Sequence, residues 1–162
     1  MKYEIPAQTR IGHVHLKVGN LERSIAFYAD LLGFTITQRY GDQAVFLSAG
    51  GYHHHIGLNT WYSKDASPAS QRAPGLFHTA ILFPDRKDLA VILKRLLAHQ
   101  YPLTGAADHG VSEAIYLNDP DQNGVELYWD KPKEQWPIDK DGGLAMVTEP
   151  LDLEALLLLA DD

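Results

Sequence analysis

A strand followed by a helix near the N-terminus constrains the fold more than any other stretch of this sequence. Residues 10–17 alternate in character, with His13 and His15 on one side and apolar side chains on the other, which is typical of a half-buried strand. Asn20 suits the N-cap of a helix over residues 21–32, whose apolar positions recur at helical spacing. We expect this unit to place a histidine on a strand face that its own helix covers.

The same pattern occurs a second time along the chain. When His13 is aligned with His78, the cap residue Asn20 aligns with Asp85, and the two helix starts agree. Two copies of a unit of about 55–65 residues are too few and too long for a solenoid. The duplication therefore predicts a pseudo-twofold arrangement with something at its centre.

Each copy is predicted to have the order strand, helix, strand, strand, strand. The predicted parts are module one (residues 10–62), a polar linker rich in Ser, Ala and Pro (63–74), module two (75–130) and a C-terminal tail (131–162). We expect residues 1–162 to form a single α+β domain, with the leucine-rich tail packed on the body or on a second subunit.

Composition narrows the classes of function. The formal net charge is −7 and no basic stripe is present, which argues against a nucleic-acid partner. No apolar run approaches the length of a membrane span, and the first residues lack a signal core, so we expect a cytoplasmic protein without a membrane partner. The chain has no cysteine, so a bound metal would need nitrogen and oxygen ligands.

Three residues suit a metal site. His13 and His78 hold the same position in the two copies, and Glu126 lies in the last predicted strand between apolar Val125 and Leu127. Two imidazoles and one carboxylate form the facial triad that binds iron(II) and leaves positions open for substrate and oxygen. The alternative is that both histidines are satisfied core residues and Glu126 is exposed at a sheet edge. The equivalence of the two histidines favours the metal site.

The chain resembles the vicinal oxygen chelate superfamily, which includes glyoxalase I, bleomycin-resistance proteins and extradiol dioxygenases. The resemblance rests on residues 11–28, 76–81 and 118–128, and it is most similar to the catechol 2,3-dioxygenase-like group through residues 53–61 and 108–117. It implies two βαβββ modules that pair into an incomplete β-barrel around a central divalent metal.

The resemblance also implies roles for individual residues. It assigns His13, His78 and Glu126 as the metal ligands, and His54, His109 and Tyr116 as catalytic residues. His54 would hydrogen-bond to oxygen, while Tyr116 and His109 would handle substrate protons. Where glyoxalase I has a fourth ligand, a glutamate, this chain has Gly57, which favours the dioxygenase pattern. The triad accepts Fe(II) or Mn(II), with iron favoured.

The run of histidines at positions 53–55 falls within a strand predicted over residues 52–61. On a strand, His53 and His55 would share the face opposite His54, so at least one of the three is expected to be structural or solvated.

The leading hypothesis is a metal-dependent extradiol-type dioxygenase that takes a small aromatic substrate and dioxygen and works as a homodimer. Two alternatives stay open. One is another vicinal oxygen chelate enzyme of the glyoxalase, isomerase or transferase kind. The other is a non-catalytic binding protein like the bleomycin-resistance proteins.

Overall fold

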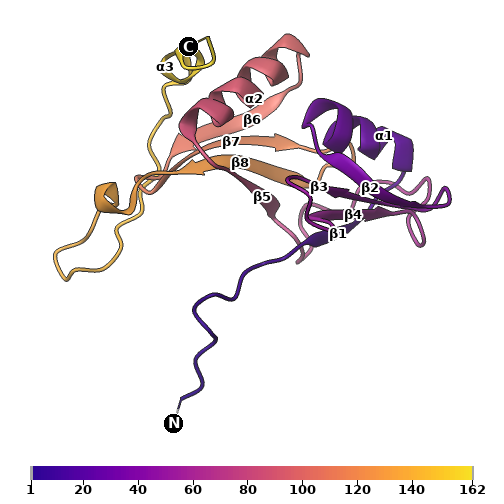
Figure 1. Ribbon diagram of the computed structural model, residues 1–162, viewed down its shortest axis with the longest axis horizontal. Coiled ribbons are helices and arrows are strands. Elements are labelled where there is room, and N and C mark those ends of the chain that lie inside the picture. Colours follow the sequence, from indigo (N-terminus) through magenta and orange to yellow (C-terminus); the bar gives the residue numbers. More distant parts are fainter. Residues whose placement is uncertain (1, 162) are drawn as a thin grey trace. The chain divides into compact units, whose positions relative to one another are not determined.

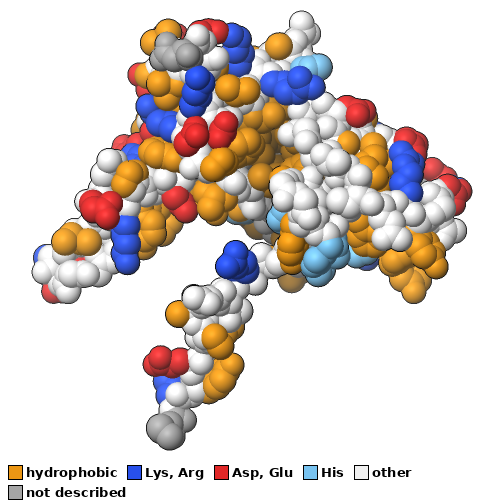
Figure 2. Space-filling view, viewed as in Figure 1, with side chains coloured by type: hydrophobic (Ala, Val, Ile, Leu, Met, Phe, Trp, Pro, Cys, Tyr) orange, Lys and Arg blue, Asp and Glu red, His pale blue; other side chains and the backbone are white. Residues whose placement is uncertain are grey.

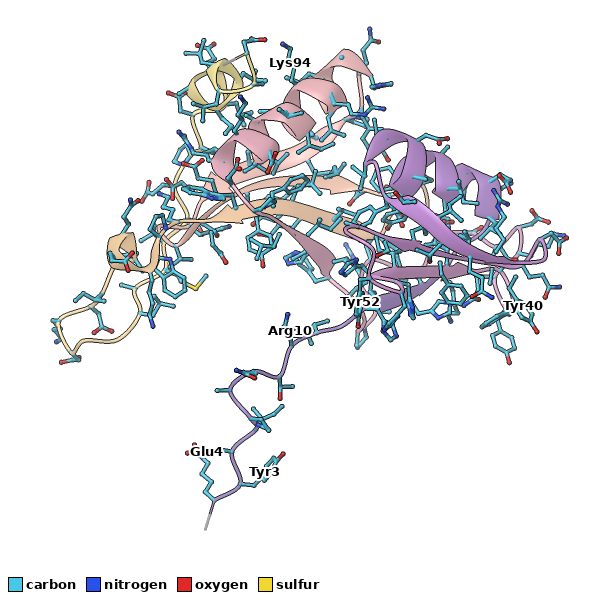
Figure 3. All side chains as sticks on the ribbon, in the orientation of Figure 1. Tyr3, Glu4, Arg10, Tyr40, Tyr52 and Lys94 are labelled. Carbon is cyan, nitrogen blue, oxygen red and sulfur yellow. The ribbon has the colours of Figure 1, made fainter. Side chains whose placement is uncertain are left out.

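The structure is a computed structural model that describes residues 2–161. The chain divides into two compact units, Met1–Ser67 and Pro68–Asp162, and the division falls within the predicted linker. Ahead of the first strand, residues 2–13 form an arm with little regular structure, on which Tyr3, Glu4 and Arg10 are labelled in Figure 3.

Unit one contains one βαβββ module (Figure 1). Its elements are β1 (Val14–Lys17), α1 (Leu21–Ile25), the π-helix η1 (Ala26–Leu31), β2 (Thr35–Tyr40), β3 (Ala44–Ser48) and β4 (Ile56–Asn59). The strand order is β1-β4-β3-β2, with β1 parallel to β4 and the other pairs antiparallel. The Asn20 side chain caps α1 through the Arg23 N–H at 2.9 Å, as predicted.

Unit two repeats this topology. Its elements are β5 (His78–Phe83), α2 (Arg86–Ala98), β6 (Leu103–Asp108), β7 (Ser112–Asn118), β8 (Gly124–Asp130), the 3₁₀-helix η2 (Lys133–Gln135) and α3 (Leu153–Leu158). The strand order β5-β8-β7-β6 matches that of unit one position by position. The prediction of an α+β fold built from two βαβββ modules is confirmed, and the sheet of each unit is open rather than closed into a barrel.

The helix of each module covers the apolar side of its sheet. In unit one Leu16 and Leu58 are buried, whereas His13 and His15 are exposed. The expectation that the helix covers the histidine face is therefore wrong. The reason is that the apolar side of the alternating strand is the side whose burial stabilises the fold.

The strand predicted over residues 52–61 is shorter than expected. Only Ile56–Asn59 pairs as β4, and residues 52–55 form a loop after the positive-φ glycines Gly50 and Gly51. The Thr37 hydroxyl donates to the His53 carbonyl at 2.8 Å and stabilises this loop. The strand-face argument for the three histidines is thus wrong, because they are not on a strand.

The C-terminal tail packs on its own unit. Helix α3 contacts α2, Leu156 is fully buried, and Lys94 of α2 forms an ion pair with Asp161. Figure 2 shows acidic and basic side chains mixed over this helix pair. Among the residues described, none of the helices has both the length and the apolar character needed to cross a membrane.

Candidate active site

Three strands of unit two bring polar side chains to the sheet face opposite α2. Tyr116 of β7 pairs in register with Glu126 of β8, and Ala80 of β5 is the partner of Glu126 on the other side. Since alternate residues of a strand share a face, His78 lies on the same face as Glu126 and Tyr116. The intervening apolar positions Val125 and Leu127 are buried on the helix side and fix this register.

These side chains form a continuous chain of contacts. His78 Nε2 lies 2.9 Å from Glu126 Oε2, and the Tyr116 hydroxyl lies 3.1 Å from the other carboxylate oxygen, Oε1. On the far side of Tyr116, His109 Nε2 is 2.6 Å from the hydroxyl oxygen. The Glu126 side chain is only 12% exposed, so its charge is partly desolvated and depends on these partners.

The approach of β5 to β8 depends on a glycine. A Cβ atom at Gly124, the register partner of His78, would lie 2.2 Å from the Phe77 carbonyl oxygen and 3.1 Å from His78 Cβ. Any larger residue would therefore push the His78 backbone away from β8.

The pair His78 and Glu126 fits a divalent metal. Two nitrogen or oxygen ligands, each about 2.1 Å from an ion at adjacent octahedral corners, are about 3 Å apart. The 2.9 Å between His78 Nε2 and Glu126 Oε2 is compatible with that spacing and is also the length of an ordinary hydrogen bond between the two side chains. His78 Nδ1 is buried and makes no hydrogen bond among the described residues. The orientation of the ring is therefore set by its Nε2 side.

Tyr116 is held in its neutral form. Burial, and then the charge of Glu126 and the hydrogen bond to it, raise the pKa of Tyr116 to about 12. Near neutral pH the residue therefore keeps its hydroxyl proton and can act as a hydrogen-bond donor.

Unit one brings together another pair of the predicted site residues. The ring centroids of His13 and His54 are 4.3 Å apart, and His53 Nδ1 lies 2.8 Å from His54 Nδ1. Burial, followed by the neighbouring histidines, lowers the pKa of His54. The lowered pKa favours the neutral His54 ring, in which one nitrogen is a donor and the other an acceptor.

Gly57 occupies in unit one the register position that Glu126 occupies in unit two. Gly57 pairs with His15 of β1, as Glu126 pairs with Ala80 of β5. A Cβ atom at Gly57 would lie 2.9 Å from His15 Cγ, and the His15 ring is fixed by a 2.9 Å contact between its Nε2 and Asn59 Nδ2. The His15 ring fills the space that a glutamate side chain at position 57 would enter.

The three predicted metal ligands belong to different units. His78 and Glu126 are in contact within unit two, whereas His13 belongs to unit one. In the part of the chain that the structure describes, no three His, Asp or Glu side chains lie close enough together to hold a metal ion.

A pocket of about 630 Å³ lies beside the site in unit two. His78 and Tyr116 contribute to its wall, together with the linker residues 69–71, 73 and 74, the residues 75–77 that follow the linker, and the turn residues 121–124. From the sequence, the linker was predicted only to be a polar connection between the modules. Its contribution to the wall of this pocket was not predicted. The exposed apolar pair Leu76 and Phe77, directly after the linker, is the sequence feature that could have indicated this pocket.

The comparisons with known proteins all indicate the same family. The sequence profile described as the Glyoxalase/Bleomycin resistance protein/Dioxygenase superfamily matches residues 10–127. The chain is 41% identical over 158 residues to a catechol-2,3-dioxygenase of Bacillus subtilis, covering 98% of this chain and 54% of that protein. It is 31% identical over 125 residues to biphenyl-2,3-diol 1,2-dioxygenase 3 of Rhodococcus globerulus, covering 75% of this chain and 63% of that protein.

Solved structures share the fold at lower identity. A glyoxalase/dioxygenase from Nostoc punctiforme aligns with a TM-score of 0.65 at 14% identity, covering 82% of this chain and all of that one. A glyoxylase/bleomycin resistance protein/dioxygenase domain from Frankia sp. aligns with a TM-score of 0.63 at 22% identity, covering 77% of this chain and all of that one. By contrast, the chain spans only about half to two thirds of the length of the dioxygenases that it matches in sequence.

Proposed function

Because the chain belongs to the glyoxalase/bleomycin resistance protein/dioxygenase superfamily, we propose that it is a metal-dependent extradiol-type dioxygenase that cleaves a catecholic or related vicinal-oxygen substrate. The observation that carries the proposal is the contact chain from His78 through Glu126 and Tyr116 to His109. It joins His78 and Glu126, which are residues of the kinds that bind metals, to Tyr116 and His109, which are suited to proton transfer. A relative that is 41% identical to this chain is a catechol-2,3-dioxygenase.

The proposed metal ligands are His13, His78 and Glu126. A divalent ion, Fe(II) in the first instance and Mn(II) as the other candidate, would supply Lewis acidity toward the substrate hydroxyls and a position for dioxygen. The spacing of the His78 and Glu126 ligand atoms supports this assignment, and so does the equivalence of His13 and His78 in the two modules.

The remaining residues would manage protons and orientation. Tyr116 would hydrogen-bond to a substrate hydroxyl, since its own proton is retained near neutral pH. His109, at 2.6 Å from Tyr116, would accept a proton passed through that hydroxyl. His54, beside His13, would offer a hydrogen bond to dioxygen from a ring whose neutral form is favoured by its lowered pKa.

The pocket beside His78 would receive the aromatic part of the substrate. Its volume of about 630 Å³ is in the range of small-molecule sites, and Leu76 and Phe77 supply apolar wall. The proposal also retains a homodimer, for which Leu158 of the tail stays exposed although Leu156 is buried on its own unit, and a cytoplasmic location.

The test is the metal content of the full chain purified without chelator, compared with two ligand variants and one control. We expect close to one iron or manganese per chain, lost in His78→Ala and in Glu126→Gln and retained in His99→Ala, which removes an exposed histidine at the end of α2. Anaerobic addition of catechols followed by oxygen should then give ring-cleaved product. Tyr116→Phe should keep the metal and lose turnover by roughly 100-fold or more.

Two outcomes would contradict the proposal. If the wild type holds no metal and does not regain it on addition of Fe(II), a ligand-binding protein without turnover would fit better. If metal is bound but oxygen is not consumed with any catechol, another reaction of the same superfamily would replace ring cleavage.

A further inference from the structure

A segment of the C-terminal tail pairs with the end of β6, next to His109. Residues 147–149, which we call the strap, lie outside the part of the chain that the family profile matches. The Asp108 N–H donates to the Glu149 carbonyl at 2.8 Å, and the Glu149 N–H donates back to the Asp108 carbonyl at 2.9 Å. The Val147 N–H donates to the His109 carbonyl at 3.1 Å. The strap is therefore held by main-chain bonds at the free edge of the sheet.

The turn that carries His109 is also fixed from its other side. Lys131 Nζ forms an ion pair with the Asp108 carboxylate at 2.7 Å, and the Gly110 N–H donates to Asp108 Oδ1 at 2.8 Å. A Cβ atom at Gly110 would lie 2.8 Å from Pro137 and 3.3 Å from Val147. The tail therefore packs closely over the turn, and a glycine is needed beneath it.

The same strap contacts the His109 ring. His109 Nδ1 lies 2.9 Å from the Val147 carbonyl oxygen. A carbonyl accepts hydrogen bonds and has no proton to donate, so this contact requires the proton of the neutral ring to be on Nδ1. Nε2 then carries the lone pair and lies 2.6 Å from the Tyr116 hydroxyl, whose single proton therefore has two acceptors within reach, this nitrogen and Glu126 Oε1 at 3.1 Å.

We propose that the strap is a positioning element that uses the Val147 carbonyl to hold His109 in its Nδ1–H tautomer, so that Nε2 is kept as the proton acceptor for Tyr116. In the other tautomer Nε2–H would donate to the Tyr116 oxygen. Nδ1 would then have no proton, and its lone pair would face a lone pair of the Val147 carbonyl oxygen, which is repulsive. The ring would then be unable to take a proton from Tyr116. The role of this tautomer in catalysis rests on the proposed function. The assignment of the tautomer rests only on the contact with the Val147 carbonyl.

The test reads the tautomer directly. Long-range ¹H–¹⁵N correlation spectra of the metal-free full chain with ¹⁵N-labelled histidine distinguish the two ring nitrogens. Loss of one pattern in His109→Gln assigns the His109 signals. At a pH where the ring is neutral, we expect a protonated Nδ1 and an unprotonated Nε2 in the wild type. A wild-type ring protonated on Nε2 would overturn the proposal.

Strap variants then test the cause. Val147→Pro removes the N–H that holds the strap to His109, and it should abolish the single Nδ1–H pattern. Val147→Ala keeps the main chain, and Thr148→Val removes only a hydroxyl 3.4 Å from Nδ1, so both should keep the pattern. If the Val147→Pro chain does not fold, Glu149→Pro, which removes the Glu149 N–H bond to Asp108, takes its place.

The outcomes separate this inference from the proposed function. An unchanged tautomer in the folded proline variant would show that the strap does not set it. If the tautomer responds but no catechol is cleaved by the wild type, the positioning inference stands and the dioxygenase assignment fails. If both hold, Val147→Pro should lower kcat and alter the pH profile of kcat with little change in metal content.

Discussion

The His15 ring occupies the space that a side chain at position 57 would need. We predict that Gly57→Ala lowers the free energy of unfolding by about 1–3 kcal/mol, because the new methyl group would meet the His15 ring at 2.9–3.1 Å. The ring cannot easily turn away, since it contacts Asn59 and packs beside Phe46 and Trp61. Urea denaturation measures the loss.

The control for this effect removes the obstructing ring. In His15→Ala the added methyl group at position 57 should cost much less, so the double variant should show a clear coupling energy. Equal effects of Gly57→Ala with and without the His15 ring would show that backbone conformation, and not the ring, requires glycine there.

Tyr101 gives a prediction for alkaline pH. Burial, and then the nearby Asp119 charge, raise the pKa of Tyr101 to about 12, and its hydroxyl donates to the Asn118 carbonyl at 2.7 Å. In the unfolded chain a tyrosine ionises near pH 10. Between about pH 10 and 12 the folded state therefore binds the more protons, and stability must fall as pH rises; below pH 10 this group contributes no pH dependence.

The measurement is the free energy of unfolding across that interval in wild type and in Tyr101→Phe. The variant should be less stable at neutral pH by about 1 kcal/mol for the lost hydrogen bond, yet lose stability less steeply above pH 10. Phenolate absorbance of the folded and urea-unfolded chains gives an independent reading. Identical slopes in the two proteins would contradict the assignment.

At the scale of helices and strands, the repeated apolar pattern of the sequence predicts the order of the elements in both modules. The helix starts at Asn20 and Asp85 follow from capping chemistry, and the order of strands follows from the duplication, because both depend on local sequence. The loop at residues 52–55 was not predicted: it follows the positive-φ glycines Gly50 and Gly51, and the Thr37 hydroxyl, which is distant in sequence, donates to its His53 carbonyl. The strap could not be predicted for the same reason.

Helix α2 is joined to its sheet by an ion pair that sequence does not indicate. Arg86 Nε lies 2.7 Å from Glu113 Oε2, and the Glu113 side chain is only 8% exposed on the helix side of β7. We predict that Arg86→Met lowers the free energy of unfolding by about 2–3 kcal/mol, because it leaves a buried carboxylate without its partner. Chemical denaturation of the full chain tests this.

Lys87→Met is the matched control, since it removes a neighbouring exposed cation from the same helix turn. It should change stability by no more than about 0.5 kcal/mol. If both variants lose the same stability, the general charge of the helix start, and not the pair with Glu113, would be responsible.

At the scale of the whole molecule, the proposed triad raises the question of whether its ligands come from one chain or from two. His13 belongs to unit one, and His78 and Glu126 belong to unit two, so the proposed triad needs a module of each kind. The modules could come from one chain or from two. Because the two units are joined covalently, each meets the other at an effective concentration of about a millimolar, well above that of a dilute protein, and we therefore expect the ligands to come from one chain.

Mixed chains decide between these arrangements. A chain with His13→Ala and a chain with Glu126→Gln each lack one ligand, so neither should bind metal alone. If two chains shared their ligands, a heterodimer of these variants would contain one intact triad, made of His13 from one chain and His78 and Glu126 from the other. Because we expect each chain to complete its own site, the two variants produced together in one cell and purified through two different tags should hold no more metal than either alone. A clear gain of metal in that heterodimer would show instead that the triad forms across two chains, and the dimer would then be a requirement of the chemistry.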